Sequence, residues 1–420
     1  MKAYQHIALI TAIISAGRFV YFFPSMGNGY YVFLAVCLAL LLLIGTKSIV
    51  LRFSGLFLFA ACAASIFANE IPRAYHPWLR LGLFAVVVLL VGPFLSTSLL
   101  RKFRHRLFWY MELGLTLIAL LSFIGRFVGL SLTQGRYWCG ITAHSMLLGI
   151  VAANAGVFLL YLLTGNNELT IRQRWTIGGI LIVALIMMLG AASRAALLAF
   201  IGGSGVSLYV LFKDYSSKVV KKVLVFAIVI VCLWPALEQY TSNVKRKNSG
   251  NIIQVDLSSR QDLWERNWEA FNDNPYFGIG FAFETADSSG FGRGRVEPGS
   301  SWLAVLSMTG MFGGICVFVI MLWVLLALKK IHGKNKNTAA LLYGLFAFYI
   351  VHMCAEGYIF SGGSMACFNF WLLLGMIESE ASNTVEENFT DNGVNKGSLQ
   401  NLIQLLTGHS LRKTRSQTRP

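Results

Sequence analysis

Long apolar segments recur along most of the chain, and no other feature constrains its fold as strongly. About 20 apolar residues are needed for a helix to cross the hydrocarbon core of a bilayer. Because hydrocarbon offers no hydrogen-bond partners, such segments must form helices or closed barrels. Their length and unbroken apolarity exclude the short alternating strands of a barrel. We therefore predict an all-α, polytopic membrane protein with about twelve transmembrane helices, at approximately 7–24, 30–45, 50–69, 78–98, 107–128, 140–163, 175–190, 194–212, 219–239, 300–328, 340–360 and 363–377.

The loops between these segments differ in charge. One alternate set, with Lys2, holds sixteen basic residues: Lys47, Arg101, Lys102, Arg104, Arg106, Arg172, Arg174, Lys213, Lys218, Lys221, Lys222, Lys329, Lys330, Lys334 and Lys336. The opposite short loops hold five: Arg73, Arg80, Arg126, Arg136 and Arg194. Cytoplasmic loops of membrane proteins are enriched in lysine and arginine. This bias predicts that both termini are cytoplasmic, and it accounts for the net charge of +16 without a nucleic-acid partner.

The domain organisation follows from the same pattern. Residues 1–377 form one integral membrane domain, and residues 240–299 form its one long external loop, in the periplasm or its equivalent. Residues 378–420 are polar and are predicted to be a disordered cytoplasmic tail. The basic cluster Arg412–Arg415 can contact anionic lipid headgroups, but a solvated tail that obeys the charge rule is the simpler interpretation.

The external loop contains a predicted amphipathic helix. Ser258, with Gln261 three residues later, matches a capping box, and Pro275 ends the helix. Apolar and aromatic residues recur between them at helical spacing: Leu263, Trp264, Trp268 and Phe271, with Asn267 on the same stripe. Such a helix can lie on the membrane surface or over a cavity. Ser300 or Ser301 can then cap the next span.

Arginines gather on the predicted external side. A guanidinium group matches a phosphate bidentately and keeps its charge when partly buried. A cluster of them would therefore suit a lipid-linked pyrophosphate, although each one alone could simply reach lipid headgroups. Arg194 is the strongest candidate because it lies between two apolar segments, where a charge is usually functional. The candidates are Arg136, Arg194, Arg260, Arg266, Arg293 and Arg295, with Trp264 beside them.

Two residues are candidates for proton transfer. Glu297 precedes the 300–328 span, where low-dielectric surroundings can raise a carboxyl pKa and make it a general base. It could equally be an ordinary loop acid that pairs with a nearby arginine. His144 precedes its span similarly and could position substrate, or it could make only a structural contact. His352 and Glu356 are predicted to share one face of the 340–360 helix, as a functional pair or as helix–helix contacts.

The sequence shows no glycine-rich nucleotide-binding loop, no HExxH motif and no aspartate pair that would hold a metal with a nucleotide sugar. An external site has no nucleotide supply, so its donor would be linked to a lipid. We expect no cofactor and no metal.

Together these motifs resemble the O-antigen ligase and polymerase superfamily of bacterial membrane glycosyltransferases. The resemblance rests on Ser259-Arg260 with Leu263-Trp264, on Asn274-Pro275-Tyr276-Phe277-Gly278-Ile279-Gly280, and on the Ser193-Arg194 motif within Gly190–Ala196. It continues through Ser300-Ser301-Trp302-Leu303 and Thr309-Gly310-Met311-Phe312-Gly313. Many relatives have His-Asn-Ser where this chain has Gly299-Ser300-Ser301, so the histidine proposed as their base is absent. Glu297 is the candidate replacement.

The resemblance implies a metal-independent, inverting glycosyltransferase in the bacterial inner membrane, with its site facing the periplasm. The donor is a glycan on undecaprenyl pyrophosphate. The acceptor is another lipid-linked glycan in a polymerase, or lipid A–core in a ligase. Absence of the ligase-type histidine favours a polymerase of surface polysaccharide or exopolysaccharide, with membrane lipids and other polysaccharide-assembly proteins as partners.

A transporter or flippase for lipid-linked glycans is an alternative of another class. About twelve spans suit it. No internal repeat is evident, however, and the polar signal is concentrated in one external loop.

Overall fold

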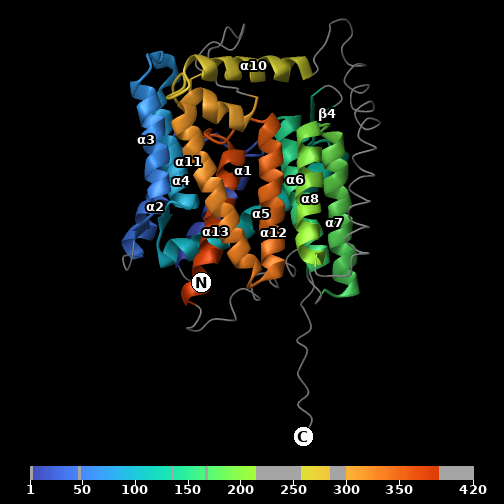
Figure 1. The fold of residues 1–420 in the computed structure, drawn as a ribbon. Helices are drawn as coiled ribbons and strands as arrows, with labels where there is room; N and C mark the ends of the chain where they lie inside the picture. Colours follow the sequence, from blue (N-terminus) through green and yellow to red (C-terminus); the bar gives the residue numbers. More distant parts are fainter. Residues whose placement is uncertain are drawn as a thin grey trace, which may run out of the picture.

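The computed structural model describes residues 3–45, 49–134, 137–165, 169–213, 257–283 and 299–386. Most of the described helices run side by side as a bundle, and α10 lies across one end of it (Figure 1). The helices are α1 (Ala3–Gly17), α2 (Gly29–Ile44), α3 (Phe53–Phe67), α4 (Pro77–Val91), α5 (Ser98–Phe127), α6 (Ser145–Gly165), α7 (Ile171–Gly190), α8 (Arg194–Phe212), α10 (Leu257–Asp273), α11 (Ser301–His332), α12 (Lys336–Ala355) and α13 (Met365–Glu386).

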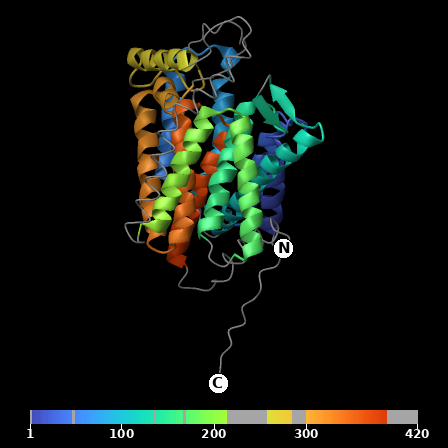
Figure 2. The ribbon, with the colours of Figure 1, turned by 90° about the vertical axis from the view of Figure 1, so that its right-hand side faces the viewer.

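Two short antiparallel ribbons and one 3-10 turn connect these helices. Strand β1 (Val50–Leu51) pairs with β2 (Leu95–Ser96), and β3 (Leu132–Gln134) pairs with β4 (Tyr137–Gly140). The 3-10 turn η1 (Arg73–Tyr75) precedes α4. The β3–β4 hairpin lies toward the same end of the bundle as α10 (Figure 2). We call this the α10 end and the opposite end the distal end.

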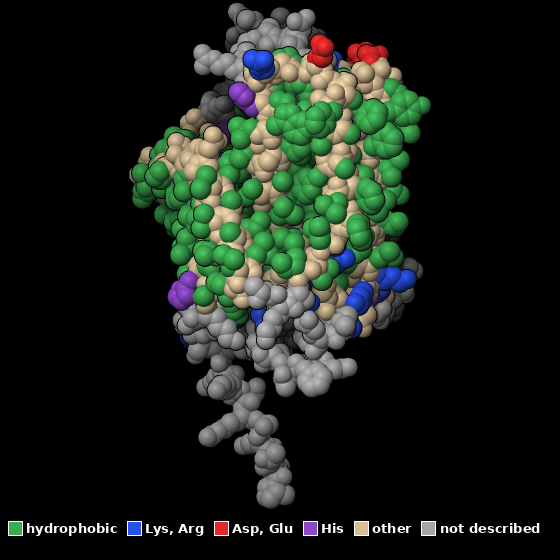
Figure 3. All heavy atoms as spheres, turned by 90° about the vertical axis from the view of Figure 1, so that its left-hand side faces the viewer, with side chains coloured by type: hydrophobic (Ala, Val, Ile, Leu, Met, Phe, Trp, Pro, Cys, Tyr) green, Lys and Arg blue, Asp and Glu red, His purple; other side chains and the backbone are tan. Residues whose placement is uncertain are grey.

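The helices are apolar enough to place this chain in a membrane. Among the described residues, seven helices have the length and hydropathy of membrane spans, and α1, α2 and α3 are shorter apolar helices. The flank that carries α3 is almost entirely hydrophobic, with charged side chains near its two ends (Figure 3). The prediction of a helical, multi-pass membrane protein is therefore confirmed. The number of spans stays a prediction, because 219–239 lies outside the described residues.

Several helices begin or end at other residues than the sequence predicts; α1, for example, ends at Gly17 and α4 at Val91. Helix α5 begins at Ser98, where the Thr97 side chain accepts a hydrogen bond from the Leu100 amide. Helix α13 continues past the predicted domain boundary at 377 to Glu386. Helix α12 ends at Ala355, and Glu356 is extended, with φ −139° and ψ 132°. The prediction that His352 and Glu356 share one helical face is therefore wrong, because Glu356 has left the helix.

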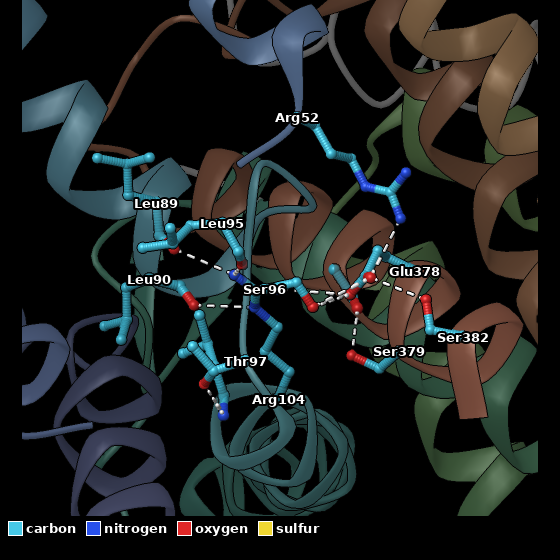
Figure 4. Close-up of polar contacts among 12 residues, drawn as sticks. Arg52, Leu89, Leu90, Leu95, Ser96, Thr97, Arg104, Glu378, Ser379 and Ser382 are labelled. Atoms are coloured by element: carbon cyan, nitrogen blue, oxygen red, sulfur yellow. Dashed lines mark hydrogen bonds and ion pairs between the residues drawn. The ribbon is translucent and has the colours of Figure 1, made fainter. Parts of the chain in front are cut away.

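At the distal end, a buried arginine joins α5 to its neighbours. Arg104 is fully buried, and its Nε donates to the carbonyl of Leu90 at 3.0 Å. Its Nη2 donates to the carbonyls of Leu89 and Leu95 at 3.1 and 2.6 Å. Its Nη1 lies 3.6 Å from a carboxylate oxygen of Glu378 (Figure 4). Leu89 and Leu90 lie in the last turn of α4 and Leu95 lies in β2, so Arg104 fixes the α4–α5 connection.

Glu378 completes this network from α13. Its carboxylate lies 3.2 Å from Nη2 of Arg52, and it accepts hydrogen bonds from the Ser96 and Ser382 hydroxyls (Figure 4). Its side chain is almost fully buried. Charges buried to this degree are tolerated when they are paired and hydrogen-bonded. The last turns of α13 are therefore part of the folded bundle.

Replacing Glu378 with glutamine should destabilise the protein by about 3 kcal/mol or more, because it leaves the Arg104 charge buried without its counter-charge. Glu380→Gln is the matched control. Glu380 lies two residues along α13, is more exposed than Glu378, and faces His105 at 3.3 Å. Thermal unfolding in detergent should show a large loss for Glu378→Gln and a small one for Glu380→Gln. Equal stability of Glu378→Gln and the wild type would contradict this role for Arg104.

Candidate functional site

At the α10 end, the Asn274–Gly280 motif binds along a kink in α11. The backbone of Gly310 departs from helical geometry inside α11, with φ +62° and ψ −161°. The Met311 amide donates to the Pro275 carbonyl at 2.7 Å. The Ile279 amide donates to the carbonyl of Ser307 at 2.8 Å. Two motifs that are separate in the sequence therefore form one backbone-bonded unit.

Two glycines make this close approach possible. Gly278 and Gly310 have φ of +67° and +62°, a conformation that side chains disfavour. A Cβ atom on Gly310 would overlap the carbonyl oxygen of Tyr276, and one on Gly278 would overlap the carbonyl oxygen of Ser307. Because of the kink, some backbone groups of α11 lack their helical hydrogen-bond partners, and the 274–280 segment supplies partners in their place.

Replacing Gly310 with alanine should detach this segment, because the new methyl group would collide with backbone rather than with a flexible side chain. We expect a loss of about 2 kcal/mol or more of stability and loss of activity, since strain and two or more hydrogen bonds are affected. Gly205→Ala is the control, because a Cβ there meets nothing within 4 Å. Melting in detergent checks the prediction, and a Gly310→Ala protein as stable as Gly205→Ala would contradict it.

Helix α3 holds the other side of the same turn. The Asn69 side chain donates to the Gly278 carbonyl at 2.9 Å and to the Ser65 carbonyl at 2.8 Å. The Ser65 hydroxyl accepts a hydrogen bond from the Phe281 amide at 3.0 Å. We call residues 277–282 the central turn. It is clamped between α3 and α11.

Helix α10 is tied to the top of α11. The Ser307 hydroxyl donates to the amide oxygen of Asn267 at 2.6 Å, and both side chains are buried. Trp264 Nε1 donates to the carbonyl of Gly299 at 3.3 Å. Helix α10 covers the residues of the predicted stripe. Trp268 is 49% exposed, whereas Leu263, Trp264 and Phe271 are half-buried. The helix includes Ser258, one residue after its start at Leu257, and it ends before Pro275 as predicted.

Arg194 is the first residue of α8 and follows a sharply bent turn. Ala192 adopts φ +52°, and the Ser193 hydroxyl caps α8 by accepting a hydrogen bond from the Ala196 amide at 3.4 Å. Trp138 packs on Gly190 so closely that no Cβ would fit there. The Arg126 guanidinium lies 3.9 Å from the centre of the Trp138 ring. The turn that presents Arg194 is therefore held rigidly.

His144 lies at the start of α6, beside this turn. A Cβ on Gly149 of α6 would lie 2.6 Å from the Cβ of Ser193, so the first turns of α6 and α8 pack together. His144 is exposed, and its Nδ1 accepts a hydrogen bond from the Leu147 amide at 3.3 Å. This bond gives His144 a structural role as a helix cap, and it leaves the ring at the α10 end.

Ser300 and Ser301 bind the end of α12 instead of capping α11 with their side chains. The Ser301 hydroxyl donates to the Glu356 carbonyl at 2.7 Å and accepts from the Tyr358 amide at 2.9 Å. The Ser300 hydroxyl donates to the Met353 carbonyl at 3.3 Å. Burial raises the pKa of Tyr358 well above its ordinary value, so its hydroxyl stays protonated.

A cavity of about 330 Å³ opens beside the central turn. Arg80 of α4 lines it and donates to the Ala282 carbonyl at 3.4 Å. Arg18 contacts the wall of this cavity, where its Nη2 donates a hydrogen bond to the carbonyl of Gly363 at 3.3 Å. The remaining lining residues are Tyr31, Leu83, Ala304, Met308, Gly357, Tyr358, Ile359, Phe360, Ser361 and Gly362. We call this the Arg80 cavity.

In the sequence, Arg80 contributes only to the charge bias that indicates membrane orientation, and its place in a cavity is not predicted. The available signal was weak. Arg80 follows Pro77 within the first turn of an apolar span, and Arg18 lies inside another such span. Charged residues within or at the border of an apolar membrane span are usually functional.

The predicted site residues are only partly covered by the described structure. Arg194, His144, Arg266 and Trp264 lie at the α10 end, and Arg266 Nε donates to the Asp262 carbonyl at 3.3 Å. Arg260 is on α10, but its side chain lies outside the description. Four predicted residues lie outside the described residues: Arg136, Arg293, Arg295 and Glu297.

Part of the chain matches a known family. Residues 179–318 match the family model described as O-Antigen ligase. The match includes the Arg194 turn, α10, the central turn and the kinked half of α11, and it confirms the resemblance to the O-antigen ligase and polymerase superfamily. Members of this family are glycosyltransferase-like membrane enzymes. A comparison with curated proteins gave no significant match.

Proposed function

We propose that this protein is a membrane glycosyltransferase that extends a surface polysaccharide from glycans linked to undecaprenyl pyrophosphate. The observation that carries the proposal is the joining of α10, the central turn and kinked α11 at the end of the bundle that also presents Arg194. Substrate-binding groups held on rigid elements in this way favour positioning of a charged substrate. The family match supports the same chemistry.

The proposed reaction is a single displacement at the anomeric carbon. The hydroxyl oxygen of the acceptor sugar forms a bond to that carbon on the face opposite the leaving group. The carbon–oxygen bond to pyrophosphate breaks, and its electron pair leaves with the lipid pyrophosphate. The acceptor proton passes to a general base, for which Glu297 is our candidate. The configuration at the anomeric carbon is inverted.

The arginines supply the electrostatic part of the reaction. Arg194 and Arg260 are proposed to bind the pyrophosphate and stabilise its charge as the bond breaks. The neighbouring external arginines, Arg136, Arg266, Arg293 and Arg295, would add to the positive potential. Arg194 is the first residue of α8, and the N-terminal amides of a helix favour an anion nearby. We propose that no metal ion is needed.

Trp264 is proposed to contact the glycan. Its indole Nε1 is engaged by the Gly299 carbonyl, which fixes the ring orientation. A fixed ring costs little conformational entropy when a sugar packs on it.

The acceptor distinguishes a polymerase from a ligase. Absence of His-Asn-Ser at residues 299–301 favours polymerase, with transfer to lipid A–core as the second candidate. A test uses purified protein in liposomes with lipid-linked repeating units alone, or with added lipid A–core. A ladder of longer lipid-linked glycans supports a polymerase, and transfer only to lipid A–core supports a ligase. Movement of lipid-linked units between leaflets without transfer would indicate a transporter.

The site is proposed to face the periplasm, with both termini in the cytoplasm. Helix α11 ends and α12 begins at the distal end, where Lys329, Lys330, Lys334 and Lys336 cluster (Figure 1). Positive loops of this kind stay cytoplasmic, so α10 would be external.

Cysteine labelling tests this orientation with Asp273→Cys on α10 and Lys334→Cys at the distal end. Each is made in a Cys354→Ser background, because the Cys354 thiol is exposed. We expect an impermeant maleimide to label position 273 in intact spheroplasts and position 334 only after lysis. Labelling of both positions from one side would contradict the proposed topology.

A further inference from the structure

An apolar groove runs between α3 and α11, on the flank that faces lipid. Its volume is about 460 Å³, and its lining is almost wholly hydrophobic. Three of the lining residues on α3 are alanines, and small side chains there leave room between the two helices. The residues that matter below are Ala60 on α3, Phe277 of the central turn, and Phe312 and Val319 on α11. We call this the α3–α11 groove.

The groove ends at the central turn. Phe277 begins this turn, and its ring lies 5.3 Å from that of Phe312, centre to centre. Both rings are partly exposed, at 41% and 50%. They line the end of the groove that lies nearest α10.

The Arg80 cavity lies on the other side of the same turn. Ala282 closes the turn and lines the cavity, whereas Phe277 opens it and lines the groove. On α11 the two hollows are also neighbours, because Met308 lines the cavity and Phe312, four residues along, lines the groove. The apolar α3–α11 groove and the Arg80 cavity therefore lie on either side of the central turn.

This combination fits one kind of molecule. An apolar chain is stabilised by an apolar groove in proportion to the area that it covers. An anionic group is stabilised by Arg80 at the mouth of a partly enclosed cavity, where its charge is less screened than in water. A long isoprenoid chain that ends in a pyrophosphate carries both features within one molecule.

We infer that the isoprenoid chain of the lipid-linked donor lies in the α3–α11 groove, and that its pyrophosphate lies past the central turn, where Arg80 adds its charge to those proposed for Arg194 and Arg260. The inference rests on the proposed function for the identity of the donor. In this arrangement the central turn contacts the donor where its isoprenoid chain joins its pyrophosphate. The arrangement also brings α3 and α4, which lie outside the matched residues 179–318, into the binding site.

Photo-crosslinking tests the location of the chain without requiring transfer. The probe is an isoprenyl pyrophosphate with a diazirine in its chain, added to wild-type protein in liposomes. We expect crosslinks on peptides that contain 54–64 and 312–319, which are competed by unlabelled isoprenyl pyrophosphate but not by excess phospholipid. Crosslinks spread evenly over other helices, or competed by phospholipid, would show ordinary lipid contact and overturn the inference.

A groove-filling variant tests the same point through kinetics. Ala60→Phe places a ring in the groove, and Gly179→Phe is the control on α7, where a Cβ meets nothing within 4 Å. We expect Ala60→Phe to raise KM for a long-chain donor by about tenfold, with a short-chain donor and the control unaffected. Equal effects on long and short chains would overturn the inference. If wild-type protein transfers no glycan yet crosslinks as expected, the proposed function fails and the chain site stands.

Discussion

Replacing Arg194 or Arg260 with alanine should severely lower the rate of glycan transfer while the protein still folds and inserts. Loss of one charge-assisted contact to the leaving pyrophosphate is expected to cost about 2–4 kcal/mol of transition-state stabilisation. That range corresponds to a rate lowered by about 30-fold to 1,000-fold. Lysine should rescue either position poorly, because a point charge cannot reproduce the bidentate contact of a guanidinium group. Transfer by purified variants in liposomes is the measurement.

Arg174→Ala provides the control for these variants. Arg174 is an exposed arginine in the first turn of α7, at the distal end, so its removal changes net charge equally without touching the proposed site. Its transfer rate should match the wild type. Wild-type turnover of the Arg260→Ala protein would remove this residue from the site. Because Trp138 and Ser193 hold the turn before α8, Arg194→Ala should leave the melting temperature nearly unchanged.

Replacing Glu297 with glutamine should lower turnover by about a hundredfold or more while donor binding is kept. The reason is chemical. The attacking sugar hydroxyl must lose its proton, and glutamine has the size of glutamate without its basicity. Glu297 also precedes the position where many relatives have His-Asn-Ser and this chain has Gly299-Ser300-Ser301. Separate measurement of donor affinity and single-turnover rate distinguishes a lost base from lost binding.

His144 supplies the comparison for that experiment. Its Nδ1 already accepts a hydrogen bond from the Leu147 amide, so His144→Ala should lower the stability of the protein. Its effect on glycan transfer should be smaller than that of Glu297→Gln. If Glu297→Gln keeps full turnover while His144→Ala abolishes it, the base lies at the start of α6. The proposed replacement of the family histidine by Glu297 would then be wrong.

Much of the fold follows from the sequence because membrane helices are specified locally. Apolar length alone indicated most of the helices, since lipid leaves the backbone no alternative. The end of α12 was misplaced because apolar residues continue through Tyr358, Ile359 and Phe360, whereas the chain leaves the helix at Glu356. Hydropathy cannot distinguish an apolar loop that is buried in protein from a continuing helix.

The site could be predicted only in part. Its motifs were recognisable as sequence, and Gly278 and Gly310, which lie in two of these motifs, have the positive φ that the contact requires. Their mutual docking could not be predicted, because it depends on backbone hydrogen bonds between residues about thirty positions apart. The same holds for the Arg80 cavity and for the pairing of Arg104 with Glu378, which join helices far apart in the chain. In these places the residue type indicates that burying the side chain costs free energy, but it does not identify the residue whose contact offsets that cost.

Release of undecaprenyl pyrophosphate, measured together with glycan length, tests the central claim most directly. Purified wild-type protein is placed in liposomes with lipid-linked repeating units as the only substrate and with a chelator present. The account predicts one released lipid pyrophosphate for each unit added to a growing glycan, and loss of both signals in Arg260→Ala protein. The account would be contradicted if the glycans stay at their starting length and no lipid pyrophosphate is released, even after lipid A–core is added as a second acceptor.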